Sequence, residues 1–202
     1  MNKIQLLSLN SIFFISGFSA LIYQIAWQRI LFTAFGVDLE SITIIISVFM
    51  AGLGIGAYYG GRIADKYPKK IILLFAIAEL SIGTFGFSSP FLIALNQEWF
   101  LHSNTLIIAL SNFILLLTPT FFMGCTLPLL TQYLNKFIDN VGNNIGWLYF
   151  SNTLGAATSC ILTGFLLFRY LTINEVIYLA ATLNILIALI ILFKYRGHNE
   201  NN

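Results

Sequence analysis

The chain has very little charge for its length. Asp, Glu, Lys and Arg make up 9% of its 202 residues, whereas 58% are hydrophobic, and the mean hydropathy is +0.85. A soluble domain carries about 25% charged residues, because water must solvate its surface. This shortage excludes a water-soluble globular fold, and the net charge of +2 does not support nucleic-acid binding. We therefore expect most of the chain to lie in lipid.

Residues that bind metals or form disulfides are also scarce. The two cysteines, Cys125 and Cys160, lie in apolar segments without CxxC or Cys/His spacing, so buried thiols fit better than a disulfide or a zinc site. The two histidines, His102 and His198, are expected on opposite sides of the membrane and cannot share a metal. We predict no catalytic residue, no cofactor and no bound metal.

Long apolar runs are abundant. A helix needs about 20 apolar residues to cross the bilayer core of about 30 Å. The first run has no small-residue cleavage site, so we expect a retained helix and not a signal peptide. We predict an all-α integral membrane domain over 1–194, without a soluble catalytic domain, and a short tail over 195–202. Its six transmembrane helices are expected at Gln5–Trp27, Ser41–Gly61, Ile71–Leu92, Thr105–Phe122, Ile145–Tyr170 and Glu175–Phe193.

The basic residues indicate an orientation. Lys and Arg concentrate on the cytoplasmic side of membrane helices. With both termini in the cytoplasm, only Arg29 and Arg169 lie outside. We therefore predict cytoplasmic N- and C-termini. The basic residues then inside are Lys3, Arg62, Lys66, Lys69, Lys70, Lys136, Lys194 and Arg196.

Small residues recur at every fourth position in two of the spans. Such residues share one helix face, and a face of small side chains lets another helix backbone approach closely in lipid. We interpret both stripes as packing faces within the chain, with a homodimer contact or a sliding surface as alternatives. The stripes are Gly52, Gly56 and Gly60 in the second span and Ser151, Gly155 and Ser159 in the fifth.

Glu79 is an acid well inside the third span, about 12 Å from the cytoplasmic end at 1.5 Å per residue. A charged acid there costs about 2.5–3.5 kcal/mol, so we expect it to face protein and to have a partner. It either binds a proton, a cation or a substrate amine, or it locks helices together through hydrogen bonds. Partners expected at comparable depth are Thr118, Thr120, Ser151, Asn152 and Thr153.

Other polar side chains extend the set of candidate binding residues. Asn112 lies nearer mid-membrane than Asn152. Gln24 belongs with Gln28 and Arg29 to a polar group at the outer end of the first span, where snorkelling to the interface is the simpler interpretation. The hypothesis of a substrate or ion site rests on Glu79, Asn112, Asn152 and Gln24.

Two prolines bracket a glycine near the end of the fourth span. Pro119 and Pro128 each remove a backbone donor, with Gly124 between them. Broken helices line binding sites in some transporters. We favour a plainer interpretation, in which the helix break is a plain kink before a short interfacial helix at Leu127–Phe137.

The segment Gly60–Lys70 resembles the loop signature of the major facilitator superfamily, Gly-x-x-x-Asp-Arg/Lys-x-Gly-Arg-Arg/Lys, with Pro68 in place of the second glycine. The resemblance implies half of a major facilitator fold, in which this loop acts as a conformational latch against neighbouring helix ends. The latch residues would be Gly61, Arg62, Asp65, Lys66, Lys69 and Lys70.

A second resemblance covers nearly the whole chain. Five blocks are similar, in order, to the membrane domain of the fused spermidine synthase-like proteins of bacteria. That family joins such helices to a cytoplasmic aminopropyltransferase-like domain. The resemblance implies a multi-pass protein of the bacterial inner membrane, here without the synthase domain. The blocks are Ser16–Arg29, Gly52–Ala57, Glu79–Gly83, Pro119–Leu130 and Leu148–Ala157.

Three functions follow as hypotheses. In the first hypothesis, the chain is a non-enzymatic membrane module. It anchors or serves a separate soluble aminopropyltransferase- or methyltransferase-like partner, or presents a membrane-associated substrate to that partner. Alternatively, two copies form a twelve-helix transporter for polyamines or other small solutes, with Glu79 as the coupling acid. A third hypothesis, an intramembrane enzyme using Glu79 with Asn112 or Asn152, has the least support.

Overall fold

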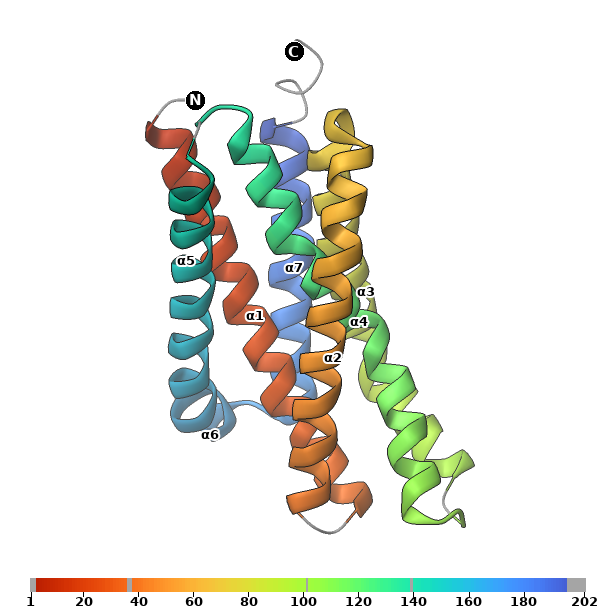
Figure 1. Cartoon of the computed structure of the whole chain (residues 1–202). Coiled ribbons are helices and arrows are strands. Elements are labelled where there is room, and N and C mark those ends of the chain that lie inside the picture. Colours follow the sequence, from red (N-terminus) through yellow and green to blue (C-terminus); the bar gives the residue numbers. More distant parts are fainter. Residues whose placement is uncertain (1–2, 36–37, 101, 139, 196–202) are drawn as a thin grey trace.

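A computed structural model describes residues 3–35, 38–100, 102–138 and 140–195, and these form a bundle of long helices (Figure 1). No strand occurs within these ranges. A 3-10 turn at Pro68–Lys70 precedes α3, and a π-helical turn at Thr163–Leu167 follows α5. The helices are α1 (Lys3–Phe35), α2 (Asp38–Lys66), α3 (Ile71–Trp99), α4 (Thr105–Asn135), α5 (Val141–Leu162), α6 (Phe168–Tyr170) and α7 (Ile173–Tyr195).

Within the described ranges, six helical stretches are long and apolar enough to cross a membrane. This confirms the predicted fold class of six transmembrane helices. The fifth stretch, Val141–Tyr170, joins α5, the π-helical turn and α6. The predicted tail begins at Tyr195, where α7 ends, and 196–202 lies outside the described residues.

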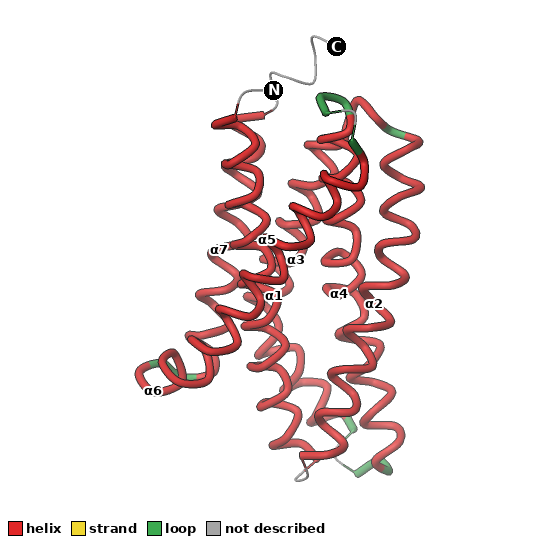
Figure 2. Tube along the Cα trace, turned by 60° about the vertical axis from the view of Figure 1, so that its left-hand side comes forward, coloured by secondary structure: helices red, strands yellow, loops and turns green. Residues whose placement is uncertain are grey.

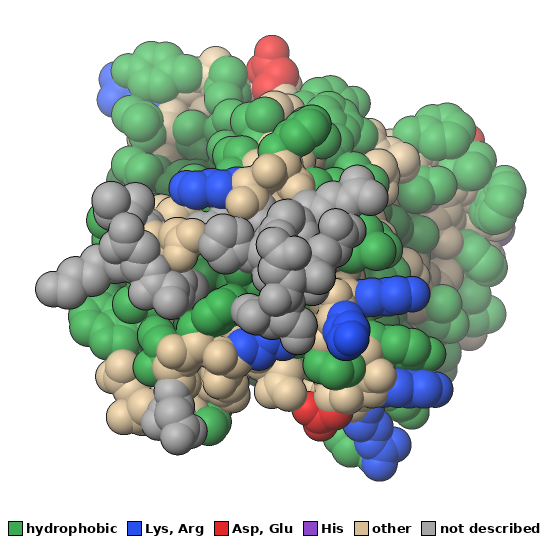
Figure 3. Space-filling model, turned by 90° about the horizontal axis from the view of Figure 1, so that it is seen from above, with side chains coloured by type: hydrophobic (Ala, Val, Ile, Leu, Met, Phe, Trp, Pro, Cys, Tyr) green, Lys and Arg blue, Asp and Glu red, His purple; other side chains and the backbone are tan. Residues whose placement is uncertain are grey.

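Both chain ends lie at the same end of the bundle. Helix α1 starts there and α7 finishes there (Figure 1). Seen from that end, Lys and Arg side chains gather over one part of the surface (Figure 3). The arrangement fits an even number of spans, and the cytoplasmic location of this end stays a prediction.

The helices pair in a pattern that repeats within the bundle. Helix α1 packs along α5, α2 packs along α4, and α3 packs against α7 (Figures 1 and 2). Exchanging α1, α2 and α3 for α4, α5 and α7 leaves this set of pairs unchanged. The two triplets run in opposite directions through the bundle, as in the inverted three-helix repeats of facilitator halves.

The repeat extends to individual residues. A side chain added at Gly155 would overlap the carbonyl of Phe14, and one added at Gly56 would overlap the carbonyl of Phe121. A second glycine follows each phenylalanine by three positions, Gly17 after Phe14 and Gly124 after Phe121. Each of these second glycines lies against the residue three positions before the first glycine. Thus Gly17 lies against Asn152 as Gly124 lies against Leu53.

The two stripes of small residues are counterparts in this repeat. Gly52, Gly56 and Gly60 lie against α4, at Thr120, Phe121 and Cys125. In the other stripe Gly155 lies against α1 and Ser159 is buried. Packing within the chain is therefore confirmed for the glycines, and the packing of Ser151, which is partly exposed, stays a prediction.

The predicted break in the fourth span is wrong, and so is the separate helix at Leu127–Phe137. Helix α4 continues through Pro119, Gly124 and Pro128 to Asn135. Close packing on α2 supports this helix, and the hydroxyls of Thr120 and Thr126 donate to nearby carbonyls of α4. These hydroxyl bonds reach other carbonyls than those of Leu115 and Gly124, which Pro119 and Pro128 leave without a helical donor.

The basic segment after the second span is largely helical. Gly61, Arg62, Asp65 and Lys66 belong to the last turns of α2, which therefore extends beyond the predicted end at Gly61. Lys69 and Lys70 lie in the 3-10 turn. The segment predicted as a loop is thus a helix end followed by a tight turn.

Candidate functional site

A polar layer separates two apolar clusters in the bundle. One cluster contains Phe13 and Phe75, and the other contains Tyr23 and Ile82. Along α1, α3 and α7, the change from one cluster to the other occurs at the buried residues Ser16, Glu79 and Asn184. Polar groups at this depth are costly, so this layer is the first candidate for a functional site.

Glu79 is fully buried and joins three helices. The Ser16 hydroxyl donates to its Oε1 and the Asn184 Nδ2 donates to its Oε2, each at 2.6 Å. Each carboxyl oxygen therefore receives one hydrogen bond from a neutral side chain. The bonds connect α3 to α1 and to α7, so they orient all three helices around the acid.

The hydrogen-bond partners predicted for Glu79 are wrong. The two carboxyl oxygens of Glu79 accept from Ser16 and Asn184, and not from the residues that were predicted from depth along the chain, Thr118, Thr120, Ser151, Asn152 and Thr153. Thr120 donates within its own helix, to the carbonyls of Leu116 and Leu117.

Sequence reasoning missed the true partners, Ser16 and Asn184. Two signals could have found them. Asn184 is an amide in the middle of the most apolar span, and Ser16 begins the block that resembles the synthase-like family. Their partnership with Glu79 depends on helix rotation, which neither signal reveals.

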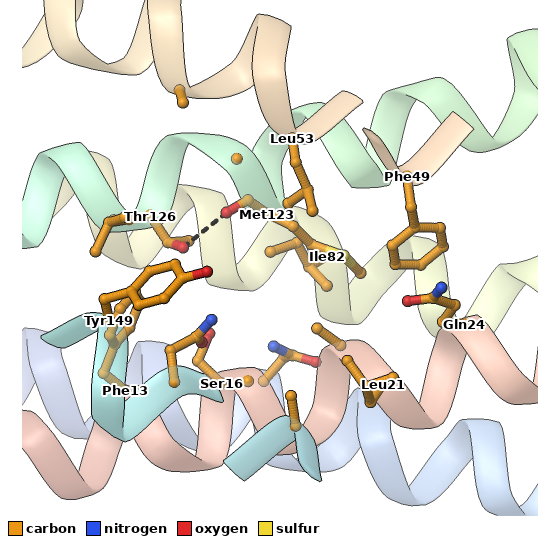
Figure 4. A pocket seen from close by; sticks show the side chains of 18 residues that line it. Phe13, Ser16, Leu21, Gln24, Phe49, Leu53, Ile82, Met123, Thr126 and Tyr149 are labelled. Carbon is orange, nitrogen blue, oxygen red and sulfur yellow. Dashed lines mark hydrogen bonds between the residues drawn. The ribbon is translucent and has the colours of Figure 1, made fainter. Parts of the chain in front are cut away.

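A cavity of about 260 Å³ lies beside this layer, chiefly between α1, α2, α4 and α5. Ser16 and Asn184 both line it, so Glu79 stands directly behind two wall residues. Figure 4 shows Tyr149 and Gln24 toward opposite ends of the cavity, with Ser16 between them. The polar lining consists of Ser16, Gln24, Thr126, Tyr149, Asn152 and Asn184.

The rest of the wall is apolar, with Phe13, Leu21, Phe49, Leu53 and Ile82 among its side chains. No lysine, arginine or histidine of the described ranges contributes to it. The cavity therefore combines hydrogen-bonding oxygens and amides with hydrocarbon surface, and it offers no cation to an anionic ligand.

The structure brings three of the four candidate binding residues together. Gln24 and Asn152 line the cavity, and Glu79 lies behind its wall. Asn112 is apart from them: it is buried, its Nδ2 donates to the carbonyl of Ile108, and it does not line the cavity. That any of these residues binds a ligand stays a prediction.

The latch segment contacts the end of α4. The Lys136 ammonium donates to the carbonyl of Pro68 at 2.5 Å. Partial burial and the neighbouring Lys69 charge lower the pKa of Lys136. Asp65 and Gly61 line a groove together with Pro128 of α4. The α2–α3 connection thus contacts a neighbouring helix end, and its role as a conformational latch stays a prediction.

Comparisons with known proteins agree with this architecture. The sequence model of the Major Facilitator Superfamily matches residues 9–202. The chain belongs to the Major Facilitator Superfamily. It is also 25% identical over 169 residues to a polyamine aminopropyltransferase of Oceanobacillus iheyensis, an alignment that covers 80% of this chain and 30% of that protein. The chain thus spans less than a third of that relative's length.

No solved structure matches the chain significantly. The family match and the relative together confirm a facilitator-like membrane module related to spermidine synthase-like proteins.

Proposed function

We propose that this chain is a membrane module that holds a small solute in its central cavity and anchors or serves a soluble aminopropyltransferase- or methyltransferase-like partner. The observation that carries the proposal is the buried carboxyl of Glu79, fixed by two residues that also line the cavity. A buried acid in a membrane span is expensive and marks a functional site by default.

The size and lining of the cavity favour a small ligand. Its volume of about 260 Å³ is below the range of about 300–1,000 Å³ typical of pockets for drug-sized molecules. We assign any chemistry to the partner. The link to a transferase rests on the relative, which is named a polyamine aminopropyltransferase.

Two separate measurements test the two parts of this proposal. The purified chain in lipid nanodiscs is titrated with butane-1,4-diamine, butane-1,4-diol and succinate in a calorimeter. Binding of at least one solute, weakened by Glu79→Gln, supports a solute site; binding of none of them contradicts it. Independently, the chain is co-expressed with a soluble aminopropyltransferase encoded beside it. Loss of that protein during purification in mild detergent contradicts the anchoring role.

A second candidate is transport by two six-helix chains. The observation that favours it is the inverted three-helix repeat, which makes this chain equivalent to half of a twelve-helix facilitator. Proteoliposomes containing the native chain are expected to take up labelled polyamine faster than empty liposomes, and Glu79→Gln is expected to reduce the rate. Uptake equal to that of empty liposomes contradicts transport, and a monomer in light scattering contradicts the homodimer.

The proposed orientation places both termini in the cytoplasm of a bacterium, with the chain in the inner membrane. Cysteines introduced at Lys69 and Ser103 lie in connections at opposite ends of the bundle. A membrane-impermeant maleimide added to intact spheroplasts should label position 103 and not position 69. The opposite pattern reverses the orientation.

A further inference from the structure

Asn184 has one hydrogen-bonding atom that the protein does not satisfy. Its side chain is 1% exposed and lines the central cavity. The Nδ2 donates to Glu79, which fixes the orientation of the amide. The Oδ1 is buried and has no partner in the described part of the chain. Buried polar atoms normally have a partner, so this acceptor requires an explanation.

The charge around this acceptor favours a cation. Glu79 is held by two neutral donors. No basic side chain of the described ranges lines the cavity. The carboxyl thus has no protein cation beside the cavity to balance a negative charge.

The remaining lining suits an alkyl amine. An ammonium group has three donors and no acceptor, and the cavity offers further amide oxygens on Gln24 and Asn152. The side chains of Leu21, Phe49 and Ile82 provide apolar surface for methylene groups. An anion would find no cation here, and a neutral alcohol would bring no positive charge to the side of the cavity where the buried acid lies.

We infer that Asn184 is a specificity-determining residue for a protonated primary amine: its Oδ1 accepts a hydrogen bond from the ammonium group, and Glu79 balances the charge from behind. This inference rests on the proposed solute site and adds the ligand class and a residue. One amide side chain thereby connects the carboxylate to the ligand, since its donor faces Glu79 and its acceptor serves the amine.

The test compares butane-1,4-diamine with butane-1,4-diol, which has the same length and no charge. Calorimetry on the full chain in nanodiscs should show at least tenfold tighter binding of the diamine. Asn184→Leu should abolish this preference. Asn184→Gln, which keeps an amide but moves its oxygen by one methylene group, should reduce it, and this variant gives an answer even where Asn184→Leu fails to fold.

Asn112→Leu is the matched control. Asn112 is also a buried asparagine whose Oδ1 has no partner in the described part, but it lies outside the cavity. Its substitution should leave the preference for the diamine unchanged. Equal binding of diamine and diol by the native chain overturns the inference, and so does an unchanged preference in a folded Asn184 variant. In both cases a solute still binds, so the proposed solute site survives. Binding of neither compound overturns the inference, and it contradicts the solute site as well when succinate also fails to bind.

Discussion

The two parallel helix pairs, α1 with α5 and α2 with α4, have the same packing and different chemistry. In each pair a phenylalanine carbonyl lies where a glycine of the other helix has no side chain, Phe14 with Gly155 and Phe121 with Gly56. The residues next to these contacts differ. Asn152 on α5 stands where α2 has Leu53, and Ser16 on α1 stands where α4 has Met123.

The difference between the two pairs distinguishes residues that pack the helices from residues at the candidate site. The α2–α4 pair shows that close packing needs only small residues and backbone contact, without a polar residue at the positions of Asn152 and Ser16. The polarity of the α1–α5 pair therefore has another cause. Ser16 donates to Glu79, and Ser16 and Asn152 both line the cavity. The shared packing thus holds the bundle together, and the polar residues of the α1–α5 pair lie at the candidate site.

The largest expected effect comes from breaking the shared packing. Gly56→Leu and Gly155→Leu each place a side chain where the carbonyl of another helix lies. Since backbone cannot move aside as a side chain does, each should destabilise the bundle by about 3 kcal/mol or more, at the upper end of overpacking effects. Fluorescence-detected gel filtration should show loss of the monodisperse protein.

Gly54→Leu is the control for both, because nothing lies within 4 Å of a side chain added at Gly54. It should keep the native elution profile. A native profile for only one of the two test variants would show that the pairs are not equivalent in packing.

The next effect concerns the polar layer. Glu79→Leu leaves the Ser16 hydroxyl and the Asn184 Nδ2 without their acceptor. A buried group without a partner costs about 1–3 kcal/mol, so thermal unfolding should occur at a clearly lower temperature. Glu40→Gln, at an exposed acid of α2, should have no such effect. Equal melting temperatures for the two variants would remove Glu79 from the structural network.

A smaller effect on stability, with a large effect on binding, is expected when one pair is made to resemble the other. Asn152→Leu copies the residue that α2 has at the equivalent position, Leu53. Because the α2–α4 pair packs with leucine there, the free energy of unfolding should change by less than about 1.5 kcal/mol, as for swaps that conserve volume. Calorimetry should nevertheless show weaker solute binding. Unchanged binding would exclude Asn152 from the site.

The smallest effect is expected at the prolines of α4, which α1 lacks at its equivalent positions. Pro128→Ala restores a backbone donor in a helix that is already continuous. One hydrogen bond contributes about 1 kcal/mol, and the lost contact of Pro128 with Gly60 offsets part of it. The melting temperature should stay equal or rise slightly. A marked fall would show that the proline itself shapes the α2–α4 contact.

The spans could be predicted because hydropathy is a property of the chain alone. The spacing of Gly52, Gly56 and Gly60 likewise predicted a packing face without a partner being known. The partners of Glu79 could not be found in this way, because residues at one depth lie on several sides of a helix. The continuity of α4 through Pro119 and Pro128 was also missed, since the packing of α4 against α2 cannot be read from the sequence.

The sequence by itself determined that this protein is an all-helical membrane protein with six spans, because a bilayer imposes one length and one polarity on any segment that crosses it. It also determined which faces could pack closely, because small residues at every fourth position share a side of the helix. Only the tertiary structure decided that Ser16 and Asn184 hold Glu79, that the two stripes are equivalent, and that a cavity lies beside the acid. These depend on how each helix is rotated and which helix it meets, and both are settled by packing among all six.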